Sequence, residues 1–293
     1  MGIEIDLMAN GSPAQSTDNL ATSRSGTPVR LTPDDIGDRV LANAAYHFAG
    51  FAGEQITGDG KFFDRSGQDH HALRGADLSD ANMFANSGYI STVDPATGVT
   101  DSTLHIPSLN FDYAGGEKLI LWWLGKTTAE GSSVSWMGDG VGAAYNGIRI
   151  RANSNQSAQL ALYNSSTHPG GLFGGSTSDM LFDGNLHSFG LFLDGENKEY
   201  GYWVDEAFDS AFGADYLTLG AGASVDTTNA NTWNIGTAYP AIALPTDGIA
   251  TQTRALHILR LPSGTSQPSV AAITTLFEKL RAHPSSLILG RAL

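Results

Sequence analysis

Residues 183–205 constrain the fold of this chain most, because they alternate apolar and polar side chains on both sides of a tight turn. The stretch starts with the turn residues Asp183-Gly-Asn and reverses at Asp194-Gly-Glu-Asn. The alternating side chains are His187, Phe189, Leu191 and Leu193 before the reversal and Tyr200, Tyr202 and Val204 after it. Asp-Gly between two such runs is a strong hairpin signal, since a primed turn needs a positive φ and glycine adopts it without strain. The stretch therefore predicts a β-hairpin.

Other segments carry the same β signature. Residues 118–124 read Lys-Leu-Ile-Leu-Trp-Trp-Leu, and six apolar residues in a row predict a strand covered on both faces. Residues 147–151 and 159–163 alternate and are joined by a turn rich in Asn and Ser. The chain has 35 glycines and only 16% charged residues, which suits many short strands joined by turns.

Together these segments resemble the concanavalin A-like jelly-roll domains of the LamG type. The hairpin is similar to the central hairpin of that family. Residues 63–73 (Phe-Asp-Arg-Ser-Gly-Gln-Asp-His-His-Ala-Leu) resemble its opening "D-x-S-G-N-G-H-H-G-x-L" segment, and residues 216–220 and 248–260 resemble later strands. In the last of these, Ala250 and Thr251 stand where the family usually has an acidic pair. The resemblance covers roughly residues 44–262 and implies an all-β fold, a concanavalin A-like jelly-roll β-sandwich.

The first 43 residues do not fit this sandwich. Residues 7–31 are mostly small or polar, and such a segment buries too little apolar surface to offset the entropy cost of ordering it. Thr32-Pro-Asp-Asp then has a helix cap, a proline at the first helical position and two acids that suit the helix dipole. Ile36, Val40 and Leu41 would form the apolar side of this short helix. We expect residues 1–43 to be an N-terminal arm used for assembly.

A second helix is predicted near the C-terminus. Ser269 is suited to cap it, and His283-Pro284 to end it. Between them, apolar residues recur at helical spacing: Val270, Ile273, Leu276, Phe277 and Leu280. We expect residues 44–265 to form the sandwich and residues 266–293 to form a helix and tail packed on it.

The charge balance argues against several partners. The formal net charge is -14, with 16 Lys and Arg against 30 Asp and Glu, and no basic cluster is present to follow a phosphate backbone. We therefore expect no nucleic-acid binding. The absence of cysteine excludes disulfides and thiolate metal sites. No apolar run of about 18 residues predicts a membrane span, and Met1–Leu7 lacks the features of a classical signal peptide.

The sequence offers no convincing catalytic motif. Glu4-Ile-Asp-Leu resembles the start of the catalytic "E-x-D-x-x-E" motif of jelly-roll glucanases, in which paired carboxylates do the chemistry. Position 9, where the third acid should stand, is Ala9, and the motif lies outside the predicted sandwich. We therefore expect no catalytic residue and no enzymatic activity.

Metal binding has equally little support in the sequence. His70 and His71 are adjacent, so in a strand they point to opposite faces and cannot both bind one ion. We interpret them as a hydrogen-bonded turn, and His187 as a satisfied histidine of the core or its rim. A Ca²⁺ ion bound through loop oxygens stays an alternative for Asp59, Asp64, Asp139 and Asp247, but no run resembles a dedicated calcium loop, and turn formation explains these residues better. We expect no cofactor.

Five residues are candidates for a carbohydrate site: Trp136, Asp139, Tyr145, Asn146 and Trp233. Their surroundings are rich in Gly, Asn and Asp, which is typical of loops. Sugar rings stack their apolar C–H faces on aromatic rings, and their hydroxyls pair with amides and carboxylates. The alternative is that the aromatic rings cap the core or pack at a subunit contact.

Three functional classes remain open, since a fold does not determine a function. The first is a non-enzymatic surface protein of a phage or phage-like particle, such as a head spike, decoration protein or tail fibre. It would be assembled in the host cytoplasm and anchored through its arm to other particle proteins, as a homo-oligomer that binds cell-surface glycan. The second is a secreted or cell-surface carbohydrate-binding module, and the third is a glycan hydrolase or lyase. The polar arm and the missing export signal favour the first.

Overall fold

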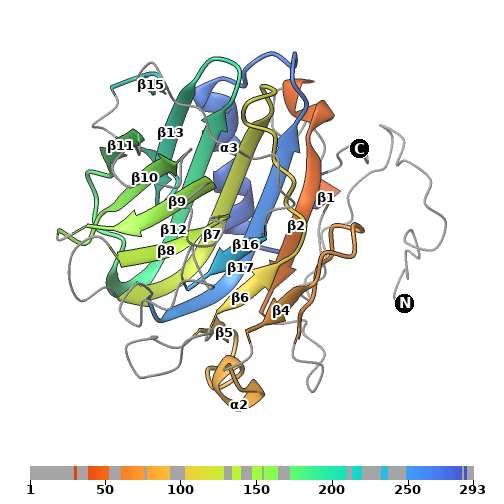
Figure 1. The fold of residues 1–293 in the computed structure, drawn as a ribbon, viewed down its shortest axis with the longest axis vertical. Coiled ribbons are helices and arrows are strands. Elements are labelled where there is room, and N and C mark those ends of the chain that lie inside the picture. The colour runs from red at the N-terminus through yellow and green to blue at the C-terminus, as the bar shows by residue number, and fades with distance from the viewer. Residues whose placement is uncertain are drawn as a thin grey trace.

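The structure is a computed structural model, and the part of the chain it describes is a β-sandwich with a C-terminal helix (Figure 1). The described residues are 30–31, 39–52, 61–75, 78–92, 103–128, 134–139, 147–153, 155–163, 172–209, 213–219, 232–236, 249–285 and 287–288. Two antiparallel sheets face each other, as the resemblance implied, and the predicted fold class is confirmed.

The first sheet contains the predicted hairpin. Its strand order is β14 (Ala207–Phe208), β13 (Glu199–Val204), β12 (Asp183–Asp194), β7 (Lys118–Thr128), β17 (Thr251–Leu261) and β2 (Ala45–Phe51). β15 (Leu217–Thr218) pairs with β13, and β5 (Ile90–Ser91) pairs with β17. Segments far apart in the chain are therefore neighbours in this sheet, most of all at β17, which lies between β7 and β2.

The second sheet lies opposite. Its strand order is β11 (Leu172–Ser176), β10 (Ala158–Tyr163), β9 (Gly147–Ala152), β8 (Val134–Gly138), β16 (Trp233–Ile235), β6 (Leu104–Ile106), β4 (Ala72–Arg74) and β3 (Lys61–Phe62). The strands predicted at residues 147–151 and 159–163 are β9 and β10, which pair antiparallel. The remaining elements are η1 (Arg39–Asn43), α2 (Asp80–Met83), α3 (Val270–Ala282) and the short parallel pair β1 (Arg30–Leu31) and β18 (Leu287–Ile288).

The hairpin turn differs in detail from its prediction. The positive φ lies at Lys198 (58°), not at Gly195, because four residues rather than two make the turn. The Asp194 carboxylate organises it by accepting hydrogen bonds from the backbone N–H groups of Glu196 (2.8 Å) and Asn197 (3.0 Å). Gly195 is required for a different reason: a Cβ there would lie 2.4 Å from the carbonyl oxygen of Tyr113.

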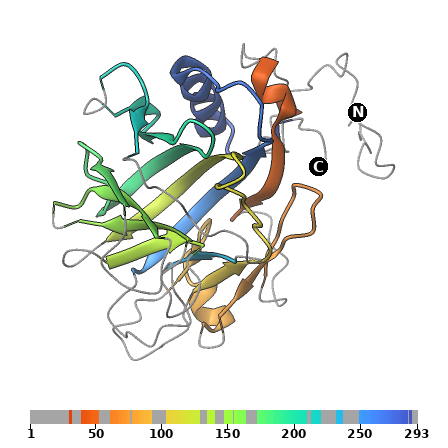
Figure 2. The same cartoon turned by 45° about the horizontal axis from the view of Figure 1, so that its top comes forward.

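β7 is covered on both faces, as its apolar run predicts. Leu119, Leu121 and Trp123 point into the sandwich, and the alternate residues Ile120, Trp122 and Leu124 point to the opposite face. α3 packs on that opposite face (Figure 2) and buries Ile273, Leu276, Phe277 and Leu280 there. Ser269 caps it as predicted, its Oγ accepting a hydrogen bond from the N–H of Ala272 at 3.1 Å. The first sheet is thus the middle layer of three.

The N-terminal prediction is tested only at its end. η1 contains Val40 and Leu41 from the predicted apolar stripe, and Leu41 is fully buried in the cluster that also contains α3 residues. Residues 1–29 and 32–38 lie outside the described residues. β2 begins at Ala45, close to the expected boundary at residue 43. The assembly role of the arm stays a prediction.

The free edge of β2 is covered by the loop that contains His70 and His71. Asp64, only 4% exposed, accepts a hydrogen bond from the N–H of Ala49 in β2 at 2.9 Å, and Arg65 N–H donates to the Ala49 carbonyl at 2.7 Å. The ring of His70 contacts the His47 carbonyl through Nδ1 at 3.0 Å. An exposed edge strand is a template for aggregation. The loop satisfies this edge, and the interpretation of the two histidines as a hydrogen-bonded turn is confirmed.

A buried histidine makes stability depend on pH. His257 lies fully buried beside the rings of Tyr46, Phe51 and Trp122, and its Nε2 is 2.8 Å from the Pro284 carbonyl oxygen. Burial lowers the pKa of His257 from 6.5 to about 4. As the pH falls, His257 therefore takes up a proton at a higher pH in the unfolded chain than in the folded protein.

We expect acid to destabilise the fold between pH 6.5 and about 4, by on the order of 3 kcal/mol from His257 alone. Urea unfolding at several pH values in this window measures the loss. His257→Leu should remove part of the acid dependence, because burial also lowers the pKa of His47, to about 3. An unchanged acid dependence in that variant would contradict the assignment.

No described helix is long and apolar enough to cross a membrane.

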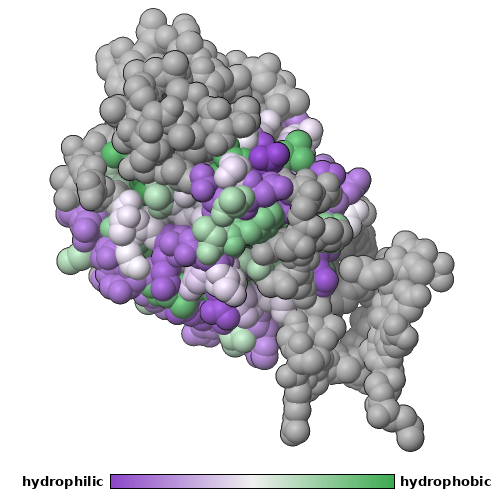
Figure 3. Space-filling model, turned by 90° about the horizontal axis from the view of Figure 1, so that it is seen from below, coloured by the Kyte–Doolittle hydropathy of each residue, from purple (hydrophilic) through white to green (hydrophobic). Residues whose placement is uncertain are grey.

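The end of the sandwich that carries α2 and β5 is seen from below in Figure 3, where hydrophilic side chains surround a smaller hydrophobic area. The candidate site lies at this end.

Candidate functional site

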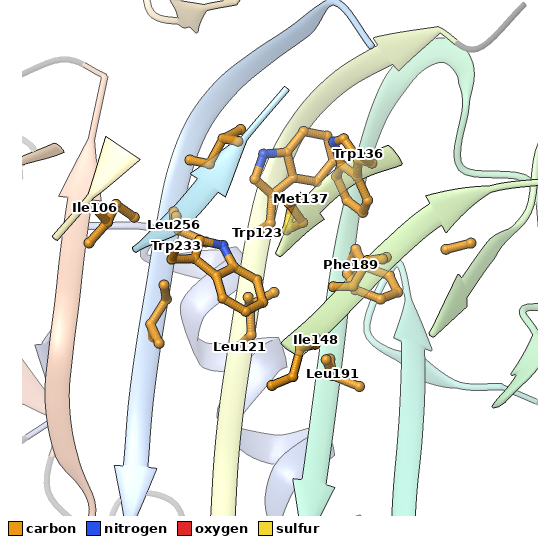
Figure 4. Close-up of a cluster of buried hydrophobic side chains, with 14 of the residues drawn as sticks. Ile106, Leu121, Trp123, Trp136, Met137, Ile148, Phe189, Leu191, Trp233 and Leu256 are labelled. Carbon is orange, nitrogen blue, oxygen red and sulfur yellow. The ribbon is translucent and has the colours of Figure 1, made fainter. Parts of the chain in front are cut away.

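The two tryptophans expected in a carbohydrate site lie in the core instead. Trp136 on β8 and Trp233 on β16 are both 0% exposed and belong to the cluster between the sheets (Figure 4). The Trp136 ring packs edge-on against Trp123, Phe182 and Phe189, with centroid distances of 4.8, 5.2 and 5.4 Å. A stacking platform needs an exposed ring face, so this expectation is wrong for both residues, and the alternative of core packing is confirmed.

Asp139 also has a structural role. It is 0% exposed, its N–H donates to the Ile148 carbonyl at 3.0 Å, and its Oδ1 accepts from the Ile148 N–H at 2.5 Å. The carboxylate therefore joins the end of β8 to β9, and a buried carboxylate held in this way does not reach a sugar. Tyr145 and Asn146 lie outside the described residues. The five candidates are not brought together in the described part of the chain.

The structure gives no support to a calcium site at the aspartates it describes. Both oxygens of Asp64 accept hydrogen bonds, including one from Ser66 Oγ at 2.7 Å, and Asp59 and Asp247 lie outside the described residues. No group of three or more His, Cys, Asp or Glu side chains is arranged to hold a metal within the described ranges.

A polar cavity of about 440 Å³ lies instead at the α2–β5 end of the sandwich. It is formed where β7, β12 and β17 end or begin, with α2 and β5 as one wall. The lining residues are Asn82, Ala85, Asn86, Ser91, Thr92, Lys126, Thr127, Thr128, Gly184, Ala250, Thr251 and Gln252. They come from five separate segments, and these described lining residues include no aromatic ring and no carboxylate.

Short sequence signals explain the position of α2 and β5, which form one wall of this cavity. Ser79 caps α2, its Oγ accepting a hydrogen bond from the Asn82 N–H at 3.1 Å, and the helix ends after one turn. The chain then turns through Gly88, which has a φ of 77°, and enters β5. β5 pairs antiparallel with β17, so that Ser91 lies opposite Gln252.

Cross-strand register then brings distant side chains into one row. Gln252 of β17 lies opposite Ser91 on one side and opposite Lys126 of β7 on the other. Directly opposite residues in antiparallel strands share a face of the sheet. Three polar side chains are therefore adjacent here, those of Ser91, Lys126 and Gln252. In the sequence, 35 positions separate the first two and 126 positions separate the last two.

Three of the four threonines that line the cavity are held by hydrogen bonds. Thr92 Oγ1 accepts from the Thr251 N–H at 3.0 Å, and Thr127 Oγ1 donates to the Ala250 carbonyl at 3.0 Å. All three threonines, Thr92, Thr127 and Thr251, are buried. These bonds fix the inner wall. The Ala250-Thr251 pair, noted in the sequence for replacing an acidic pair, lies in this lining.

Other polar groups of the cavity are not committed to the protein. The Lys126 ammonium lies 5.6 Å from the centroid of the Tyr89 ring, and it makes no hydrogen bond or ion pair with the described residues. Neither do the side-chain amides of Asn82 and Gln252 within that part of the chain. The cavity thus offers N–H donors and amide acceptors to a ligand.

A carboxylate beside the cavity is already occupied. Asp183, next to the lining residue Gly184, accepts hydrogen bonds from the Asn185 N–H (2.8 Å) and lies 3.1 Å from His187 Nε2. These contacts lower the pKa of Asp183, and the hydrogen bond from the Asn185 backbone N–H has the largest effect. His187 Nδ1 contacts Asp205 at 2.7 Å, so both ring nitrogens are satisfied, and its interpretation as a satisfied rim histidine is confirmed.

Comparison with known proteins shows similarity at the level of the fold. No protein-family model and no curated protein matches the sequence. Trypanosoma rangeli sialidase in complex with 2,3-difluorosialic acid is similar with a TM-score of 0.51 and 12% identity, over 85% of this chain and 34% of the sialidase chain.

Two toxin structures are similar to a comparable degree. A botulinum neurotoxin type C structure, described with cell entry that depends on two ganglioside molecules, has a TM-score of 0.52 and 12% identity over 80% of this chain and 51% of the toxin chain. The binding domain of botulinum neurotoxin DC in complex with rat synaptotagmin II has a TM-score of 0.50 and 11% identity, with 80% and 52% covered. This chain therefore spans about a third of the sialidase and about half of the toxin chains.

Proposed function

We propose that this protein binds carbohydrate in the cavity between α2, β5 and the ends of β7, β12 and β17. The observation that carries the proposal is a preformed hollow whose free polar groups are amides and an ammonium beside fixed threonines. Its volume of about 440 Å³ lies within the usual range for ligand pockets, roughly 300–1,000 Å³. Sugar hydroxyls both donate and accept hydrogen bonds, and side-chain amides match them in both directions.

The fold comparison supports the same class of ligand. The similar sialidase structure contains a sialic acid derivative, and the similar neurotoxin type C structure is described with gangliosides, which are glycolipids. Two different proteins that share this fold over most of the present chain are thus described with carbohydrate ligands, and this supports a sugar as the ligand of the cavity in this protein.

We propose binding without turnover. Most glycosidases use two Asp or Glu side chains on either side of the scissile bond, and the lining residues that the structure describes include no Asp and no Glu. A glycan hydrolase or lyase is the alternative. It would release new reducing ends or unsaturated products from a bound polysaccharide, and an assay for either product distinguishes the two functions.

Gln252→Ala and Asn82→Ala should each weaken glycan binding by about threefold to tenfold, because each removes one or two hydrogen bonds worth roughly 0.5–1.5 kcal/mol. A glycan array followed by calorimetry on the purified full chain measures this. Arg254→Ala is the matched control, since Arg254 is exposed on the same strand and does not line the cavity. Thermal stability should stay the same in all three variants. Equal affinity of Gln252→Ala and the wild type for a bound glycan would exclude this cavity.

The wider role that we propose is attachment to cells from the surface of a phage or phage-like particle. The polar composition of residues 7–31 supports an arm that anchors the chain to other particle proteins, and many copies would raise a weak single-site affinity through avidity. The alternative is a secreted or cell-surface carbohydrate-binding module. Negative-stain images of the native source material distinguish a particle from a free protein.

A further inference from the structure

We infer that the carbohydrate bound in this cavity carries an anionic group, a carboxylate or a sulfate ester, and that Lys126 binds it. The inference rests on the proposed function and names the class of its ligand. It is carried by the contacts of Lys126, by the lack of acidic side chains among the described lining residues, and by the hydrogen bonds that already occupy the carboxylates described close to it.

Lys126 is a cation without an acidic partner among the described residues, in a protein rich in acids. The chain has 30 Asp and Glu for 16 Lys and Arg, so a basic side chain has many acids with which to pair. Lys118, at the opposite end of the same strand, is fully buried and lies 2.9 Å from Glu196 and 3.5 Å from Asp194. Arg260 of β17 pairs with Glu117. Lys126 has no such contact with the described residues.

The Tyr89 ring holds the Lys126 ammonium at the cavity. Its centroid is 5.6 Å from Nζ, which is within the range of a cation–π contact. Such a contact restricts the side chain and leaves the N–H donors of the ammonium available. An ammonium in this position can donate charge-assisted hydrogen bonds, which are roughly twice as strong as neutral ones.

No acidic side chain among the described lining residues competes with an incoming anion. The carboxylate of Asp183, beside Gly184, is committed to Asn185 and His187, and His187 is held in turn by Asp205. Gln252 lies opposite Lys126 and can supply a second N–H donor. An anionic group therefore finds a cation and an amide donor, and no repelling carboxylate among the described lining residues.

The net charge of the whole protein does not reverse this preference. A charge of -14 repels anions at long range, but at physiological salt the interaction is screened over about 8 Å. Contacts inside the cavity are shorter than this distance. Local pairing with Lys126 therefore decides which sugar is held, and the long-range field affects mainly the rate of association.

The test uses pairs of oligosaccharides that differ only in an acidic group. The probes are lactose, sialyllactose and sulfated lactose, together with xylotriose with and without a glucuronic acid branch. The full chain, Lys126→Gln and Lys126→Arg are compared by calorimetry. Lys126→Gln removes the charge and keeps a polar side chain of similar reach, and Lys126→Arg keeps the charge. The two kinds of acidic probe show whether a carboxylate or a sulfate ester is recognised.

We expect the wild type to bind at least one acidic probe about tenfold more tightly than its neutral partner, which corresponds to about 1.4 kcal/mol. Lys126→Gln should lose this preference, so that it binds the acidic and the neutral sugar with similar affinity, and Lys126→Arg should keep most of the preference. Added salt should weaken the acidic probe only. The melting temperature of Lys126→Gln should match the wild type, because no ion pair is lost.

Two other outcomes overturn the inference in different ways. If the wild type binds neutral and acidic partners equally, or if Lys126→Gln weakens both equally, the anionic ligand is wrong and carbohydrate binding in the cavity stands. If the wild type binds no probe and no glycan on the array, the proposed function fails together with the inference.

Discussion

Trp136→Ala is expected to lower the free energy of unfolding by about 3–5 kcal/mol, the usual cost of truncating a large buried aromatic side chain. The ring is 0% exposed and packs edge-on against Trp123, Phe182 and Phe189, which join β8 to the facing sheet. A loss of this size is a large part of a typical total stability of about 5–15 kcal/mol. Urea denaturation followed by tryptophan fluorescence and circular dichroism measures it.

Trp136→Phe is the matched control and should cost less, because it keeps an aromatic ring. The indole Nε1 has no hydrogen-bond partner in the described structure, so the substitution removes packing alone. Both variants should bind glycan normally per folded molecule. A Trp136→Ala protein of normal stability that fails to bind glycan would return this residue to the binding site.

Asp64→Ala is expected to cost about 3–5 kcal/mol, because it removes the acceptor of several buried donors at once. Asp64 accepts from the N–H groups of Ala49, Ser66 and His70 at 2.9, 2.9 and 3.0 Å and from Ser66 Oγ at 2.7 Å. The Ala49 N–H belongs to the edge strand β2. Without the Asp64 carboxylate this N–H loses its hydrogen-bond partner, and the edge of β2 is left unsatisfied. Urea unfolding measures the stability loss, and light scattering should detect self-association.

Ser66→Ala serves as the control for this loop. It removes one hydrogen bond of the same carboxylate and should cost about 1 kcal/mol without promoting association. If Asp64→Ala were as stable as Ser66→Ala, the carboxylate would not organise the edge of β2, and the loop would owe its form to other contacts.

Local periodicity was sufficient for the elements that dominate the fold. The alternation around Asp194 predicted β12 and β13, the six apolar residues after Lys118 predicted a strand buried on both faces, and Ser269 marked the start of α3. Each of these elements packs against one neighbouring layer along its whole length. Buried side chains therefore recur with the period of the strand or helix, and the sequence shows this period.

The two tryptophans show where local reasoning ends. Trp136 and Trp233 lie on strands of five and three residues, β8 and β16, which are too short to show a period. Their Gly, Asn and Asp neighbours are equally compatible with an exposed loop. Only the facing sheet, which brings Trp123 and Phe189 over the Trp136 ring, decides that these side chains are buried.

The cavity depends even more on tertiary structure. The sequence shows Ser91, Lys126 and Gln252 as unrelated polar residues at strand ends, and only the pairing of β5, β17 and β7 places them in one row. The strand register also decides whether Lys126 has an acidic partner, because it determines which side chains lie close to the Lys126 ammonium. The sequence by itself determined the long elements β7, β12, β13 and α3 and the faces they bury, because burial repeats locally along them. The tertiary structure alone decided the site, because a site is made from contacts between segments that have no local relation.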